Sequence, residues 1–248
     1  DNHYGKTILG TEKEVQSLEV SDLEEFHKNY YNKQNLCIAI AGNLSKKIFE
    51  ESYENNFSYQ DEDESSQLKN NNRLIALSRT GREEINFNDI EFSRILMALN
   101  IPSLKNKRIN IGFEILASIL SGGRNSRLVR VLKEEKNIVQ SIRVYLNAGE
   151  LGGLFIIEAC CDEIYLKNVE EEINKIIEDI TNFKNLTLNE LKKAINIVKS
   201  NYIFNLETSS QLTSFFGNEL LWSRKNSLKD LDNHLAYWNN LTTFREII

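Results

Sequence analysis

SGGRNSRLVRVLKEEKNIVQSI, at residues 121–142, is the stretch that decides the fold of this chain. The paired glycines Gly122 and Gly123 are typical of the end of a helix, where glycine adopts backbone conformations that other residues avoid. The apolar spacing after them predicts a short amphipathic helix at about 125–135, followed by a strand at about 138–147. The stretch therefore indicates helices that pack on a sheet.

The rest of the chain continues this alternation of strands and helices. Further strands are expected at about 73–79, 91–101 and 153–161, and helices at about 106–121, 163–183, 187–207, 209–222 and 228–238. NAGELGG, between the last two strands, is typical of a hairpin, and Thr187 with Glu190 forms a capping-box pattern. We therefore predict an α+β fold with an antiparallel-rich sheet covered by helices.

The first sixty residues predict a helix, a strand and a second helix. Ser21 and Glu24 form a capping-box pattern at the start of an amphipathic segment. LCIAIAG at 36–42 is a short apolar run closed by glycine, which favours a buried strand, and 45–57 has helical spacing. The polar, acidic residues 58–72 then indicate an exposed linker, although a long surface loop would have the same composition.

The end of the chain repeats a pattern found near its beginning. NNLTTFREII at 239–248 matches SLEVSDLEEF at 17–26, and Ser21 and Thr242 mark the constant offset of 221 positions. A repeat of this length implies a duplicated domain, because solenoid repeats are much shorter. A chance match of so short a pattern is the alternative.

Composition fits a globular chain and argues against two classes of partner. The 248 residues are 41% hydrophobic and 27% charged, with a net charge of −6. An acidic chain does not favour nucleic acid or anionic membranes, and no apolar run is long enough to span a bilayer. We expect no nucleic-acid partner and no membrane partner. No signal peptide is recognisable, and we expect a cytoplasmic protein.

Histidine spacing argues against a metal site in this chain. The chain has three histidines, His3, His27 and His234, and no two of them lie within a helical turn of each other. A catalytic zinc site needs three well-placed protein ligands. Two of them are often histidines that lie close in sequence on one face of a helix. We therefore expect no metal ligands, no catalytic residues and no cofactor in this chain.

The pattern S-R-L-x-x-x-L-x-E-x-x-x-I at 126–138, just after the glycine pair, resembles the second-domain motif of the insulinase-type (M16) zinc metallopeptidases. Residues 3–44 resemble the segment in which the first domain of that family ends. The resemblance implies that the whole enzyme is a zinc-dependent endopeptidase that acts on unfolded peptides. Its zinc motif, H-x-x-E-H, would lie before the first residue of this sequence.

The resemblance also implies a domain organisation. Residues 1–60 would be the last helix, strand and helix of the first domain, and 61–72 the linker. Residues 73–248 would be the second domain, truncated before its last strand and helix. This portion would bind no zinc, would be inactive alone and would form half of the substrate chamber. A catalytically inactive partner or scaffold subunit is the alternative. Expected partners are a peptide substrate, the missing first domain or a partner M16 subunit, with a homodimer left open.

Members of the family carry an Arg–Tyr pair that grips the substrate backbone, in the motif L-R-E-x-x-x-x-x-Y. The matching positions hold Lys133 and Gln140 in this chain. Lysine is a point charge where arginine offers a planar fork, and glutamine lacks the ring and the acidity of a phenol. We expect these two residues to mark the substrate-binding positions, with weakened support for catalysis.

Overall fold

The computed structural model describes residues 5–32, 35–57, 80–182, 186–223 and 228–247. The chain divides into two compact units. The first unit comprises Asp1–Ile75 and Glu207–Lys225, and the second comprises Ala76–Leu206 and Asn226–Ile248.

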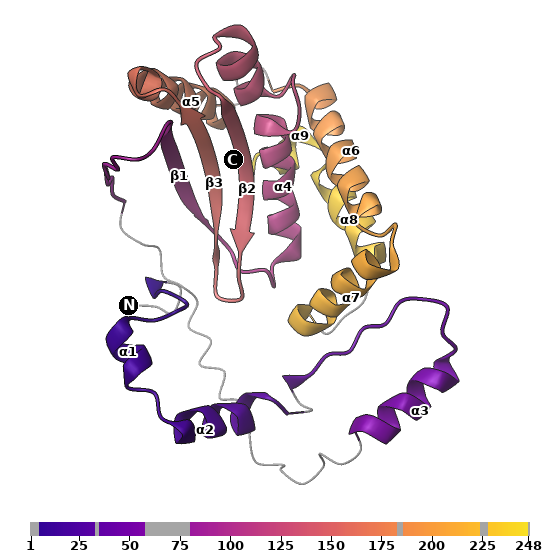
Figure 1. Cartoon of the computed structure of the whole chain (residues 1–248). Coiled ribbons are helices and arrows are strands. Elements are labelled where there is room, and N and C mark those ends of the chain that lie inside the picture. Colours follow the sequence, from indigo (N-terminus) through magenta and orange to yellow (C-terminus); the bar gives the residue numbers. More distant parts are fainter. Residues whose placement is uncertain (1–4, 33–34, 58–79, 183–185, 224–227, 248) are drawn as a thin grey trace. The chain divides into compact units, whose positions relative to one another are not determined.

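The second unit is built on a three-stranded antiparallel sheet (Figure 1). Its strands are β1 (Ser93–Ile101), β2 (Ser141–Ala148) and β3 (Gly153–Cys161), in the spatial order β1-β3-β2. These strands confirm the expected antiparallel sheet, and β2 and β3 form the expected hairpin. The strand predicted at 73–79 lies outside the described residues.

Alternation along the strands buries one face of this sheet. The inward residues of β3 are Phe155, Ile157, Ala159 and Cys161, which are between 0% and 2% exposed. Successive side chains of a strand point to opposite faces of the sheet. Apolar residues at every second position therefore bury one face and leave the other face outside the core. The same period holds along β2, where Ile142 and Val144 are buried and their neighbours are exposed.

Helices cover the buried face of the sheet. The second unit contains α4 (Lys107–Ser121), α5 (Leu166–Thr181), α6 (Leu188–Phe204), α8 (Leu228–Trp238) and α9 (Leu241–Phe244). Helix α4 packs against β2, α6 and α8, whereas α5 packs against β1 and β3 (Figure 1). Because α4 contacts both the sheet and other helices, it is apolar over a wide surface and buries Ile111, Ile115 and Ile119 beside the expected Leu116 and Leu120. This arrangement confirms the predicted α+β class.

The predicted helix at 125–135 is present but is wound more widely than an α-helix. Residues Val129–Glu135 form a π-helix, in which the Lys136 backbone N–H donates to the carbonyl of Val131 at 3.0 Å. Leu128 and Leu132, which point into the core, are both 0% exposed. Short π-helical segments of this kind are rare and are frequently found at functional sites.

An ion pair joins this π-helical segment to α6. Thr187 caps α6 as predicted, because its hydroxyl accepts the backbone N–H of Glu190 at 3.2 Å. The Glu190 carboxylate binds Arg127 instead of the cap: Nε to Oε1 is 2.7 Å and Nη2 to Oε2 is 2.8 Å. Only half of the capping box therefore forms, because the bidentate contact with a charged guanidinium is the stronger one.

The first unit contains α1 (Glu12–Gln16), α2 (Val20–Tyr30), α3 (Lys46–Phe57) and α7 (Ser209–Ser223). The capping box predicted at Ser21 and Glu24 is wrong. Helix α2 begins one residue before Ser21, since its N-cap is Glu19, whose backbone N–H donates to the Asp22 carboxylate at 2.9 Å. The Asp22 carboxylate thus takes the role that was predicted for Glu24, and its negative charge is favourable at the start of a helix.

The strand predicted at 36–42 is also wrong. These residues form no strand, and Leu36 and Ile40 are 45% and 53% exposed. An apolar segment becomes a strand when a neighbouring strand accepts its hydrogen bonds, and the described part of the first unit supplies none. The apolar face of α2 is uncovered as well, with Leu23 and Phe26 59% and 54% exposed. The first unit therefore presents apolar surface that lacks a covering layer.

The starts of two helices agree with the proposed duplication. Helix α2 starts at Val20 with Glu19 as N-cap, and α9 starts at Leu241 with Asn240 as N-cap. Both pairs are separated by the offset of 221 that the repeat predicts, although the expected cap Ser21 lies two residues after the observed cap Glu19. No described helix is long and apolar enough to cross a membrane.

Gly153 is required by a close approach of two backbones, which leads to a first prediction. A Cβ at Gly153 would lie 2.6 Å from the Ala148 Cα, in the neighbouring strand. We expect Gly153→Ala to lower the free energy of unfolding by about 1–3 kcal/mol, because backbone must move. Urea denaturation measures this. Gly217→Ala is the control, since its Cβ would meet only Ala39 at 3.6 Å. Equal stability of Gly153→Ala and the wild type would contradict the packing described.

Glu114 on α4 generates a second prediction. Burial raises the pKa of the Glu114 carboxyl to about 7, while a hydrogen bond from the Tyr202 hydroxyl, at 3.1 Å, works in the opposite direction. The folded state therefore holds this proton more tightly than the unfolded state. Stability falls as pH rises from about 4.5 to about 7, by on the order of 2–3 kcal/mol.

Glu114→Gln should remove this pH dependence. We expect the variant to match the wild type near pH 4 and to exceed it in free energy of unfolding at pH 8. Glu178→Gln, an exposed position on α5, is the control and should follow the wild type at both values. Urea denaturation across pH measures all three proteins. A Glu114→Gln variant that is no more stable than the wild type at pH 8 would refute the argument.

Candidate functional site

The second face of the sheet is not covered by the helices that form the core. Its outward side chains include Leu96, Tyr145 and Leu154, which are 64%, 36% and 37% exposed. These residues come from all three strands, and the register places Leu96 opposite Glu158 and Tyr145 opposite Ile156. We call this surface the open face. Apolar and charged side chains lie next to one another on it.

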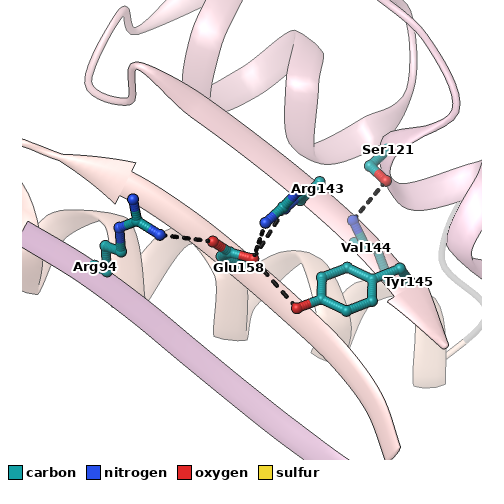
Figure 2. A network of polar contacts seen from close by, with 6 residues as sticks. All are labelled: Arg94, Ser121, Arg143, Val144, Tyr145 and Glu158. Carbon is teal, nitrogen blue, oxygen red and sulfur yellow. Dashed lines mark hydrogen bonds and ion pairs between the residues drawn. The ribbon is translucent and has the colours of Figure 1, made fainter. Parts of the chain in front are cut away.

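Glu158 is the centre of the polar contacts on the open face (Figure 2). The Arg143 guanidinium donates to one Glu158 oxygen from Nε at 2.9 Å and from Nη2 at 2.7 Å. The Tyr145 hydroxyl donates to the same oxygen at 3.2 Å, and Arg94 Nη1 contacts the other oxygen at 3.5 Å. One carboxylate on β3 therefore orients side chains from both neighbouring strands.

This network carries an excess of one positive charge, because two arginines meet one carboxylate. The Glu158 side chain is 12% exposed, whereas those of Arg94 and Arg143 are 63% and 67% exposed. The Arg143 guanidinium also lies over the Tyr145 ring, 5.3 Å from its centre. Arg143 and Tyr145 are thus fixed in place and still accessible, which suits binding to a carbonyl or carboxylate oxygen.

A side chain of α4 forms a hydrogen bond with one edge strand of the sheet. Strand β2 is an edge strand, and its Val144 N–H donates to the Ser121 hydroxyl at 2.8 Å (Figure 2). Edge strands with free N–H groups invite pairing with other chains. Ser121 therefore satisfies one outward N–H of this edge strand.

The structure places both residues at the family positions in exposed sites. Lys133 lies in the π-helical segment, and Gln140 lies directly before β2. The Gln140 backbone N–H donates to the Cys160 carbonyl at 2.7 Å and so extends the β2–β3 ladder. Ile138 and Val139 between them are buried, and they hold the connection against the core. That the two side chains act together on substrate stays a prediction.

The described residues do not fit a zinc ion. No group of three or more His, Cys, Asp or Glu side chains converges within the described ranges. His27 stacks on Tyr31 at 4.9 Å between ring centres, and His234 belongs to the other unit. Burial lowers the pKa of His234.

Sequence reasoning did not find Arg143, Tyr145 and Glu158. The signal was present in SIRVYLNA, where polar and apolar residues alternate along β2. An arginine and a tyrosine two positions apart in a strand lie on the same face. What the sequence lacks is the cross-strand register, which brings Glu158 directly opposite Arg143.

Residues 17–198 match the model of a family described as the peptidase M16 inactive domain. The match covers more than half of the chain, and the chain therefore belongs to the peptidase M16 family. The resemblance seen in the sequence is confirmed by this match.

Three further proteins are similar to this chain. An uncharacterized zinc protease of Streptomyces coelicolor is 24% identical over 246 residues, covering 95% of this chain and 52% of that protein. A protease structure from Helicobacter pylori has a TM-score of 0.75 at 19% identity, covering 96% of this chain and 57% of that chain. A structure of Complex III2 from Candida albicans with Inz-5 bound has a TM-score of 0.71 at 15% identity, covering 97% of this chain and 58% of that chain. Both structures share the fold, and the chain spans about half the length of these proteins.

The Glu158 network gives a third prediction. Glu158→Gln removes the charge that holds two arginines close together, and we expect a loss of about 1 kcal/mol in the free energy of unfolding. Tyr145→Phe, which removes only one neutral donor, should cost less. Urea denaturation compares both variants with the wild type. If Glu158→Gln is as stable as the wild type, the carboxylate does not organise the open face.

Proposed function

We propose that this chain is the non-zinc-binding C-terminal part of an M16 metallopeptidase, in which the open face forms part of the chamber that holds unfolded peptides. The observation that carries the proposal is the accessible pair Arg143 and Tyr145, which Glu158 holds in place among apolar side chains. Membership of the M16 family and the printed name of the Streptomyces relative, a zinc protease, support it.

The chemistry of the open face suits an unfolded peptide. Leu96 and Leu154 offer apolar contact to substrate side chains, which an unfolded peptide exposes. Arg143 offers N–H donors to carbonyl or carboxylate oxygens, and Tyr145 offers a ring face beside them. Binding of this kind depends on backbone carbonyls and apolar side chains, which most unfolded peptides have. The open face would therefore accept peptides of many sequences.

Cleavage itself would belong to the zinc-binding part of the whole enzyme. There a zinc ion would activate the attacking water. This chain would hold the substrate, with Lys133 and Gln140 at the family's gripping positions. Lysine places a charge without a fixed direction, so these positions would orient the substrate backbone less strictly than an arginine and a tyrosine.

The uncovered apolar surface of the first unit supports the proposal that another domain or subunit packs against it. Leu23 and Phe26 on α2, with Leu36 and Ile40, are each at least 45% exposed. We propose that the zinc-binding domain, or a partner M16 subunit, covers this surface. A second copy of this chain is the other occupant that a measurement of oligomeric state would reveal.

A fourth prediction tests the proposed function. The 248-residue chain alone should neither retain zinc after dialysis against a chelator nor cleave a reduced, unfolded peptide. The full-length gene product should bind about one zinc ion per chain and cleave that peptide until a chelator is added. Mass spectrometry of the metal and a fluorescent peptide assay measure both.

In the full-length protein, Arg143→Ala should raise KM roughly fivefold to tenfold and leave kcat within about twofold, because the arginine binds substrate without taking part in bond cleavage. Arg124→Ala, an exposed arginine paired with Glu134, is the matched control. An unchanged KM for Arg143→Ala would contradict the role of the open face.

The alternative is an inactive partner or scaffold subunit. The substituted gripping positions Lys133 and Gln140 favour it. In that case the full-length protein would bind no zinc and cleave no peptide, with or without Arg143. The same measurements therefore separate the two functions.

A further inference from the structure

A groove with a volume of about 1300 Å³ lies on the helical side of the second unit. It runs between the π-helical segment, α5 and α6, and we call it the basic groove. Its charged lining consists of the cations Arg127, Arg130, Lys136, Lys175, Lys192 and Lys193 and the carboxylates Glu172, Asp179 and Glu190. Neither Lys133 nor Gln140 is part of it, and the open face is formed by other residues.

The charge of the groove is opposite to that of the chain. The lining has an excess of three positive charges, whereas the whole chain has a net charge of −6. Two of the carboxylates are already bound: Glu190 by Arg127 at 2.7 Å and Glu172 by Lys136 at 2.6 Å. Arg130 pairs with Glu135, which does not line the groove, at 3.4 Å. The remaining cations of the lining are Lys175, Lys192 and Lys193.

Three lysines in the groove are available to a ligand. Lys175 on α5 and Lys192 and Lys193 on α6 are exposed. Within the described part of the chain, none of the three forms an ion pair with another side chain. Their charges are not offset by direct contacts, so an anionic ligand would gain new ion pairs with them.

The shape of the groove suits an extended chain better than a compact anion. Its lining follows α6 from Asn189 to Asn201, which is about 18 Å at 1.5 Å per residue. An extended peptide of five or six residues covers about the same length. The exposed lysines come from two helices, Lys175 from α5 and Lys192 and Lys193 from α6, so that carboxylates spaced along an extended segment can reach both.

The uncharged lining also fits a peptide. Val131, Ile176 and Ile197 provide apolar contact along the groove. Asn196 and Asn201 carry amides, which can both donate to and accept from a peptide backbone. An oligophosphate, which has no apolar atoms and no donors, would leave these groups unused.

We propose that the basic groove is a docking site for an acidic, extended peptide segment of a partner protein. The carboxylates of the segment bind Lys175, Lys192 and Lys193, and its backbone binds the asparagine amides. The site recruits the partner protein that bears such a segment, and it acts whether or not the whole protein is a peptidase.

The test measures fluorescence anisotropy of labelled hexaglutamate with the 248-residue chain at low salt. We expect binding of hexaglutamate, which weakens as salt is raised, and no binding of the uncharged hexaglutamine. The net charge of the chain repels hexaglutamate, and binding therefore requires a local basic surface.

Charge reversal locates the site. Lys192→Glu with Lys193→Glu should weaken hexaglutamate binding at least tenfold, and Lys175→Glu alone about threefold or more. Lys167→Glu, on α5 but outside the groove, is the matched control and should change the affinity by less than about twofold. Circular dichroism confirms that each variant is folded.

Three results would overturn the proposal. The first is no binding of hexaglutamate to the wild type. The second is equal affinity of the wild type and the Lys192→Glu, Lys193→Glu variant, which would place the binding elsewhere. The third is binding of inorganic tripolyphosphate without binding of hexaglutamate, which would define a site for small anions.

Discussion

The burial of helix α4 between the sheet and α6 is the constraint on which the second unit depends. Ile115 and Leu120 are 0% and 2% exposed, and one continuous core joins them to both layers. Trp238 closes this core from α8, where its indole N–H donates to the Arg108 carbonyl of α4 at 2.7 Å. Because α4 and α5 occupy one face of the sheet, these helices leave the other face uncovered.

This one-sided arrangement links packing to function. The inward-facing side chains of the strands form the core. The outward-facing side chains include Arg143, Tyr145 and Glu158, which therefore take no place in the core. The outer surface of the helical layer, between α5 and α6, is instead positively charged, because lysines outnumber carboxylates there. The second unit thus offers two separate surfaces, one apolar with paired charges and one basic.

The sequence predicted the helices of both units and the antiparallel sheet of the second unit, but the strand that it predicted in the first unit is absent, for a physical reason. The periodicity of α5 depends on local spacing, and its core residues Val169, Ile173 and Ile180 are buried as that spacing indicates. The strand expected at 36–42 depends on a partner strand, which local spacing cannot supply. Glu158 was missed on the same ground, since its role arises from the β2–β3 register. The motif at 126–138 indicated the family but gave no sign of the π-helical winding.

The central claim is that the open face contacts the peptide substrate, and photochemical cross-linking in the full-length protein tests it most directly. A photoreactive amino acid at Leu154, which is 37% exposed on the open face, would be compared with one at Lys167 on α5. The account predicts cross-links from position 154 to an unfolded peptide, competed by unlabelled peptide, and none from position 167. Cross-links from position 167 alone would contradict it.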